Sequence, residues 1–349
     1  MGNMPDARRT PTQRPWTGGV LGVAAACGIG LTAWLLERLG WTPVAAFLAR
    51  AGFGLLWLIP LRFAVAATEV RGWGALLGIR RRIPWLLLVW LAMVRDAVNT
   101  FLPVARVGGE LVAIRLLRLR GVNTSTASAS VIVETSVTLA LQIVITLCGI
   151  ALLLSVAGLH ASLSALALLG GIAVAAVVVA AFVAVQVRIG LAEFADRTLG
   201  RALRAVGGRG LPLVPGLDRK VMSLYRHRMV LARCAFWQLM GFAGGAAEIA
   251  LLAVLMHIPL TLVQVFVFEA LIQAIHSVAF VVPGALGVQE GGFVGLAMLL
   301  GVPPDAAFSL ALGRRLRQLA IGFPVLLSWQ WHEWRIRRLS SAQAAPTSG

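Results

Sequence analysis

Two stretches of the sequence place a glutamate seven residues after a proline. The first runs from Pro103 to Glu110 and the second from Pro283 to Glu290, so the two glutamates lie 180 positions apart. A carboxylate can bind a polar group, take up a proton or pair with a cation. A proline breaks a helix because it lacks a backbone N–H. Each stretch therefore combines a break in a helix with a group that can do chemistry.

Further identities continue at the same offset without a gap. They pair Leu116 with Leu296, Leu119 with Leu299, Gly121-Val122 with Gly301-Val302, and Ala127 with Ala307. Chance matches between apolar segments explain the Leu and Ala identities, but they explain the aligned Pro, Glu and Gly-Val poorly. We therefore expect an internal repeat, with repeat one at about 17–154 and repeat two at about 165–329.

The composition is that of a membrane protein. The chain is 59% hydrophobic and 13% charged, with a mean hydropathy of +0.86, whereas soluble domains carry about 25% charged residues. The net charge of +17 comes from Arg and Lys that lie between apolar runs, as cytoplasmic loops require. We therefore expect an all-α polytopic membrane protein with lipid partners, anionic phospholipid at its basic loops, and no nucleic-acid partner.

We expect six full spans and two proline-broken segments. The spans are 17–36, 48–70, 126–154, 165–187, 234–256 and 306–329, and the broken segments are 84–120 and 264–300. Basic residues place both termini and the loop 188–233 in the cytoplasm. Each broken segment must then begin and end on one side, as a re-entrant hairpin, and the alternative is a plain kinked helix. Counting each hairpin as a span gives eight, and the two repeats have inverted topology.

The expected domain organisation is simple. Residues 1–16 form a cytoplasmic tail, 17–335 a single transmembrane domain and 336–349 a disordered tail. The sequence leaves open whether the protein forms a homo-oligomer or binds partners from lipid biosynthesis.

Ionisable side chains inside the expected spans are candidates for function, because a buried charge is costly in a bilayer and usually faces a cavity or a partner. We predict gating or charge-carrying roles for Arg62, Asp96, Glu134, Glu248, Glu269, His276 and Arg314. Arg95, Arg315 and Arg317 lie in the same segments. Because Glu134 and Arg314 are also 180 positions apart, we expect them to form an ion pair.

The hairpin tips form the predicted head-group site. It consists of Pro103, Arg106, Gly109, Glu110, Pro283, Gly287, Gln289 and Glu290. Half-helices that begin at about Gly108 and Gly287 would direct N-terminal N–H groups towards an anionic or hydroxylated head group. The alternative is that pairs such as Arg106 with Glu110 merely close the turns.

Catalytic motifs are absent from the sequence. It has no GxxxxGK phosphate loop, HExxH, Cys-x-x-Cys or GxSxG elbow, so we predict no catalytic residue, metal or cofactor. Two alternatives to transport stay open. One is an intramembrane lipid-modifying enzyme with Glu269 and His276 as acid and base, and the other is a non-transporting scaffold for lipid biosynthesis.

The two repeats resemble a known family. The stretch from Pro103 through Arg106, Gly109-Glu110 and Gly121 to Glu134 looks like its first signature. The stretch from Pro283 to Glu290, followed by Gly301-Val-Pro and Ala306-Ala307, looks like its second. The family is the flippase-like transmembrane region of lysylphosphatidylglycerol synthases and their stand-alone relatives. The resemblance covers roughly residues 17–335.

Two departures refine this resemblance. The separate cytosolic domain that transfers the amino acid in the synthases is not found here, so we expect no aminoacyl transfer. Glu134-Thr135, Gln142 and the run from Arg314 to Gln318 look like the branch associated with hopanoid biosynthesis, called HpnL. The resemblance therefore implies a transporter of hopanoids or a similar amphiphile in the bacterial inner membrane.

Overall fold

The computed structural model describes residues 47, 49–78, 83–101, 108–156, 216–278 and 287–344. These residues contain nine α-helices, one short 3-10 helix and no strand. Three stretches are long and apolar enough to cross a membrane, namely Ala49–Leu77, Thr124–Val156 and Arg228–Leu255. The expected all-α membrane class is confirmed, while the expected spans 17–36 and 165–187 lie outside the described residues.

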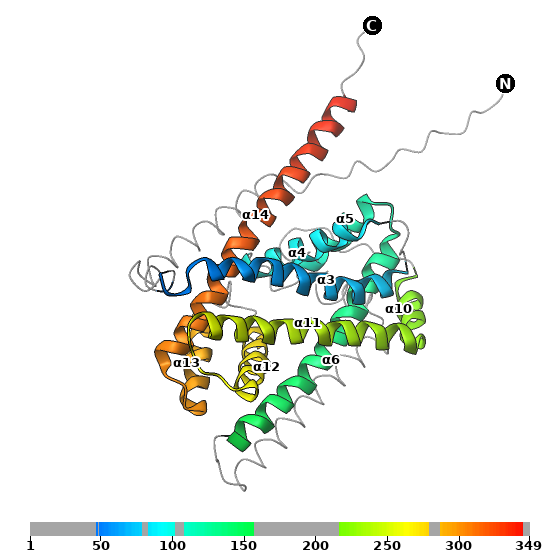
Figure 1. Ribbon diagram of the computed structural model, residues 1–349. Coiled ribbons are helices and arrows are strands. Elements are labelled where there is room, and N and C mark those ends of the chain that lie inside the picture. The colour runs from blue at the N-terminus through cyan, green and yellow to red at the C-terminus, as the bar shows by residue number, and fades with distance from the viewer. Residues whose placement is uncertain are drawn as a thin grey trace, which may run out of the picture.

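Two long helices run side by side in opposite directions at the centre of the fold (Figure 1). One is α3 (Leu58–Leu77), which continues from the 3-10 helix η1 (Gly52–Trp57), and the other is α11 (Arg228–Leu255). Gly54 lies against Leu255 at one end, and Gly72 lies against Cys234 at the other. This register makes the pair antiparallel, and glycines on both helices allow the backbones to approach closely.

Each proline-broken segment consists of two short helices. The first contains α4 (Trp85–Phe101) and α5 (Gly108–Leu119), and the second contains α12 (Leu262–Val278) and α13 (Val288–Leu300). The residues between the arms, 102–107 and 279–286, lie outside the described residues. The predicted starts of the two half-helices, near 108 and 287, are confirmed.

The sequence repeat is also a structural repeat. The helices α6 (Thr124–Val156) and α14 (Pro304–Ala344) begin 180 positions apart, as do α5 and α13. Gly121 ends α5 with a φ of 81°, and Gly301 ends α13 with a φ of 67°. The next residue then donates back to the helix, from Val122 to Leu117 at 3.1 Å and from Val302 to Ala297 at 2.9 Å. Both glycines are needed because a left-handed backbone is strained for other residues.

The two repeats pack against each other in a reciprocal way. The helix α4 of repeat one packs against α14 of repeat two, and α12 of repeat two packs against α6 of repeat one. These contacts are apolar and close, since Gly322 lies against the Phe101 ring and Gly149 against Ala270. Two apolar clusters form the main core, one around α4 and α5 and the other around α12 and α13.

The last helix is longer than the sequence indicates. We expect a span at 306–329 and a disordered tail from 336, but α14 continues to Ala344, and its end projects beyond the other described helices (Figure 1). Two guanidiniums stack on indoles one turn earlier, with Arg335 at 5.6 Å from the Trp331 ring and Arg338 at 3.7 Å from the Trp334 ring. Such i, i+4 pairs stabilise an exposed helix.

Candidate functional site

One guanidinium joins three helices in repeat one. Arg95 on α4 donates to both Glu134 oxygens on α6, at 2.6 and 3.3 Å, and its Nε lies 3.5 Å from Glu110 on α5. Gln238 on α11 donates to Glu134 at 3.0 Å. Glu134 is 2% exposed, and a buried carboxylate needs such partners because its desolvation is costly. We call Arg95, Glu110 and Glu134 the first charge cluster.

The arms of the first hairpin meet at a glycine. The Gly109 N–H donates to Oδ1 of Asn99 on α4 at 2.9 Å. A Cβ at position 109 would collide with the Arg95 carbonyl oxygen and lie 2.6 Å from Asn99 Oδ1. Gly109 therefore lets α5 begin directly beside Arg95, which brings Glu110 into the first charge cluster.

A second cluster occupies the corresponding place in repeat two. Arg314 on α14 donates to Glu269 on α12 and lies 3.7 Å from Glu248 on α11, while Arg317 donates to Glu248 at 2.8 Å. Gly245 leaves the space that the Glu269 carboxylate fills. We call Glu248, Glu269, Arg314 and Arg317 the second charge cluster.

The predicted ion pair between Glu134 and Arg314 is wrong. Glu134 pairs with Arg95, and Arg314 pairs with Glu269 and Glu248. The physical reason is that each residue finds a partner within its own repeat, on the first arm of its own hairpin. The pairs have opposite polarity, because repeat one has its Arg on the hairpin arm and its Glu on the last helix, whereas repeat two has the reverse.

The second hairpin has an ion pair of its own, between Glu290 and Arg315. Glu290, in the first turn of α13, accepts from the Gly287 N–H at 2.8 Å and from Arg315 Nη2 on α14 at 2.9 Å. The N-terminal donor of this half-helix is thus already bonded to a carboxylate. The same holds in repeat one, where Asn99 holds the Gly109 N–H. One N-terminal N–H of each half-helix is thus already bonded within the chain.

The charges of the two repeats adjoin at α3. Arg62 lies 3.3 Å from Glu69 and 3.0 Å from Asp96, and it also interacts electrostatically with Glu248 of the second charge cluster. Arg317 likewise interacts electrostatically with Asp96. Arg62 and Asp96 therefore link the two clusters into one charged region at the centre of an otherwise apolar domain.

Two buried polar atoms at the hairpin arms have no partner among the described residues. They are Oε2 of Glu110 and Nε2 of Gln289, and Gln289 is 2% exposed. Leaving a buried donor or acceptor unpaired costs about 1–3 kcal/mol. One atom is an acceptor and the other a donor, and they occupy neighbouring positions in the repeat, because 109 corresponds to 289 and 110 to 290. A hydroxyl group can both donate and accept a hydrogen bond, so a ligand with hydroxyl groups can donate to the Glu110 oxygen and accept from the Gln289 amide.

The structure covers the predicted site in part. Pro103, Arg106 and Pro283 lie outside the described residues. His276 is half-buried and has an interaction partner. No hydrogen bond or ion pair between described residues joins the tip of one hairpin to the tip of the other, so their expected joint site remains a prediction.

Sequence reasoning missed several partners. Glu69 pairs with Arg62, and Gln238 donates to Glu134. Arg115 on α5 lies 2.9 Å from Glu333 on α14. Glu69 shares the α3 face with Arg62, seven residues away, and that spacing could have indicated it. Gln238 and Glu333 gave no such signal, because their partners lie on helices that are distant in sequence.

Comparison with known proteins identifies the family of this chain. Neither a search of curated proteins nor a search of solved structures finds a match. The family model described as "Lysylphosphatidylglycerol synthase TM region" matches residues 19–325. That match spans both repeats and both charge clusters, and it indicates a membrane protein with a lipid-related function. The chain therefore belongs to the lysylphosphatidylglycerol synthase transmembrane-region family.

Proposed function

We propose that this protein is an inner-membrane lipid transporter with two re-entrant hairpins in an inverted-topology repeat. Its termini would be cytoplasmic, and six full spans would accompany the hairpins. The short paired helices α4–α5 and α12–α13 support this topology, since each has at most 17 described residues, fewer than the roughly 20 of a typical membrane span. The antiparallel packing of α3 and α11, which occupy equivalent places in the two repeats, supports the inversion.

The observation that carries the transport proposal is the charged region inside the apolar domain. Buried charges in a bilayer mark substrate or ion pathways, and half-helices at the membrane midplane commonly form transporter sites. In this protein, Glu110 and Glu290 lie in the first turns of the two half-helices, each beside an arginine. We propose that the head group of a lipid passes the hairpin tips while its apolar body stays in the membrane.

The residues favour a hydroxylated head group over an anionic one. Every described arginine of the charged region already has a carboxylate partner, namely Arg62, Arg95, Arg314, Arg315 and Arg317. One N-terminal N–H of each half-helix is bonded to a side-chain oxygen of the chain itself. The unpaired Gln289 amide and Glu110 oxygen suit hydroxyl groups. A hopanoid, the substrate implied by the family branch that the sequence resembles, fits this class when it carries hydroxyl groups.

No observation favours a lipid-modifying enzyme. Glu269, the expected acid or base, is held in an ion pair with Arg314, so its carboxylate is already occupied by a partner within the chain. We further propose that the basic helix α10 (Leu217–Arg226) rests on anionic phospholipid. It buries Leu217 and Val221 and exposes Arg219 and Lys220.

The transport proposal is tested by locating hopanoids in separated inner and outer membranes. Cells that produce the Glu110→Gln and Glu290→Gln variants should retain hopanoid in the inner membrane, as a deletion strain should. Asp218→Asn, an exposed carboxylate on α10, is the matched control and should leave the distribution normal. An unchanged distribution in both Glu variants at a normal protein level contradicts the site. A changed lipid profile without a changed location would instead indicate an enzyme.

A further inference from the structure

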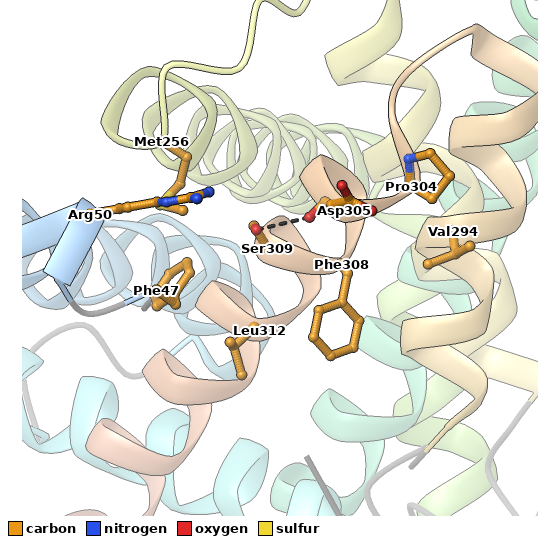
Figure 2. A pocket seen from close by; sticks show the side chains of 9 residues that line it. All are labelled: Phe47, Arg50, Met256, Val294, Pro304, Asp305, Phe308, Ser309 and Leu312. Atoms are coloured by element: carbon orange, nitrogen blue, oxygen red, sulfur yellow. Dashed lines mark hydrogen bonds between the residues drawn. The ribbon is translucent and has the colours of Figure 1, made fainter. Parts of the chain in front are cut away.

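A separate pocket lies at one end of the helix bundle, away from the charge clusters. It has a volume of about 350 Å³ and is lined by Phe47, Arg50, Met256, Val294, Pro304, Asp305, Phe308, Ser309 and Leu312. This volume lies in the range of small-molecule sites. Figure 2 shows the Arg50 side chain extending towards the first two turns of α14, where Asp305 and Ser309 lie, with Phe47, Leu312 and Phe308 along one side.

The pocket lies where membrane-crossing stretches end. Arg50 is near the start of the apolar stretch Ala49–Leu77, and Met256 directly follows the stretch Arg228–Leu255. Pro304 is the first residue of α14. Charged and polar groups at the ends of such helices lie at the level of lipid head groups. The apolar wall of Phe308 and Leu312 continues from there along α14 towards the membrane interior.

The corresponding place in repeat one is covered by protein. The repeat-one counterparts of Met256, Ser309 and Leu312, 180 positions earlier, are Leu76, Ala129 and Ile132. These residues pack against Leu217 and Val221 of α10. In repeat one, this surface is therefore covered by the apolar face of α10. In repeat two, the equivalent surface forms the pocket, which has a different lining.

The lining of the pocket selects a ligand by its charges. Arg50 and Asp305 are both exposed, and neither forms an ion pair with a described residue. The Ser309 hydroxyl donates to the Asp305 backbone carbonyl at 2.8 Å, so its oxygen can still accept a hydrogen bond. The mouth of the pocket thus offers a cation for a phosphate, and a carboxylate with a hydroxyl oxygen for an ammonium group.

We propose that this pocket binds a zwitterionic phospholipid with a primary amine, such as phosphatidylethanolamine. The phosphate pairs with Arg50, the ammonium group donates to Asp305, and an acyl chain lies along Phe308 and Leu312. An anionic phospholipid gains the contact with Arg50 but is repelled by Asp305. The site is independent of the transport pathway, because none of its lining residues belongs to a charge cluster.

Native mass spectrometry of the purified full-length protein can measure the preference. We expect phosphatidylethanolamine to bind about fivefold more tightly than phosphatidylglycerol with the same chains, since an exposed ion pair contributes up to about 1 kcal/mol. Arg50→Gln should weaken the binding of both lipids, and Asp305→Asn should abolish the preference. Arg228→Gln, an exposed charge at the opposite end of α11, is the matched control and should leave the preference intact.

Two results would overturn the proposal. The first is equal binding of the two lipids by the unaltered protein, or binding in which Arg50→Gln weakens neither lipid and Asp305→Asn leaves the preference unchanged. The second concerns residues 37–46, which precede α3 as α10 precedes α11 and lie outside the described residues. A high-yield disulfide between Ser309→Cys and Trp41→Cys, in a chain with its native cysteines changed to alanine, would show that the chain itself fills the pocket.

Discussion

Replacing Arg95 by glutamine should destabilise the protein by about 3–5 kcal/mol, the usual cost of removing one partner of a buried ion pair. Arg95 is the cation shared by Glu134, which is almost fully buried, and Glu110. Its loss leaves both carboxylates without a cationic partner among the described residues. Glu134→Gln should cost less, about 1.5–3 kcal/mol, because Arg95 keeps Glu110 and the new amide still accepts from Gln238.

A double-mutant cycle separates the pair from its surroundings. Equilibrium unfolding in mixed micelles gives the free energy of unfolding for Arg95→Gln, Glu134→Gln and the double variant. We expect the double variant to be more stable than the sum of the single effects predicts, by about 1–3 kcal/mol. Arg228→Gln, an exposed arginine on α11, should change stability by less than about 0.5 kcal/mol.

Additive effects would refute the pairing of Arg95 with Glu134. So would an Arg95→Gln variant that loses less than about 1 kcal/mol, which is the range of exposed pairs. The Arg314 and Glu269 cycle in repeat two provides an internal comparison, because that pair has the reverse polarity and a similar burial. The two cycles should give couplings of the same sign and similar size.

Three further predictions concern single positions. Gly109→Ala should lower the free energy of unfolding by more than about 2 kcal/mol, because the added Cβ collides with α4. Gly291→Ala is the control, since a Cβ at that position meets open space. Thermal unfolding of the two variants should show a loss for Gly109→Ala only. Gly121→Ala and Gly301→Ala should each cost about 1–2 kcal/mol in unfolding experiments, since both have a positive φ, and unequal losses would contradict their equivalence. Burial, with help from nearby arginines, lowers the pKa of His332 below the ordinary value of about 6.5. Its contribution to stability should therefore be complete above about pH 6.5 and disappear as the pH falls through the lowered pKa; His332→Gln should remove this dependence from unfolding curves.

The repeat and its helix boundaries could be predicted because they depend on local chemistry. Pro103 and Pro283 indicate breaks, and Gly121 and Gly301 indicate helix ends, since each acts through the backbone at its own position. The starts of α5 and α13 followed directly from those signals. The end of α14 did not, because its extension is stabilised by Arg–Trp stacking on the helix surface, which resembles an interfacial anchor in the sequence.

The partners of the charges could not be predicted in the same way. Equal spacing in the repeat suggested that Glu134 faces Arg314, but spacing gives equivalence and not contact. The actual partner of Glu134, Arg95, lies on the hairpin arm of its own repeat, and its counterpart position in repeat two holds an isoleucine, Ile275. A pseudo-twofold axis preserves the positions of helices, whereas the sign of each charge needs only to be opposite to that of its neighbour.

The distribution of ion pairs indicates which parts of the molecule can move as units. Most ion pairs between described residues join two residues of the same repeat, whereas Arg115 with Glu333 joins the two repeats. Arg115 is 37% exposed, but Glu333 is only 2% exposed, so breaking this pair would leave a buried carboxylate without its cation, which costs about 3–5 kcal/mol. The remaining contacts between repeats are mainly apolar surfaces, such as Phe101 on Gly322, together with the hydrogen bond from Gln238 of repeat two to Glu134 of repeat one. If the protein transports lipids as proposed, a movement of one repeat against the other would therefore have to break the Arg115–Glu333 pair and the hydrogen bond from Gln238 to Glu134.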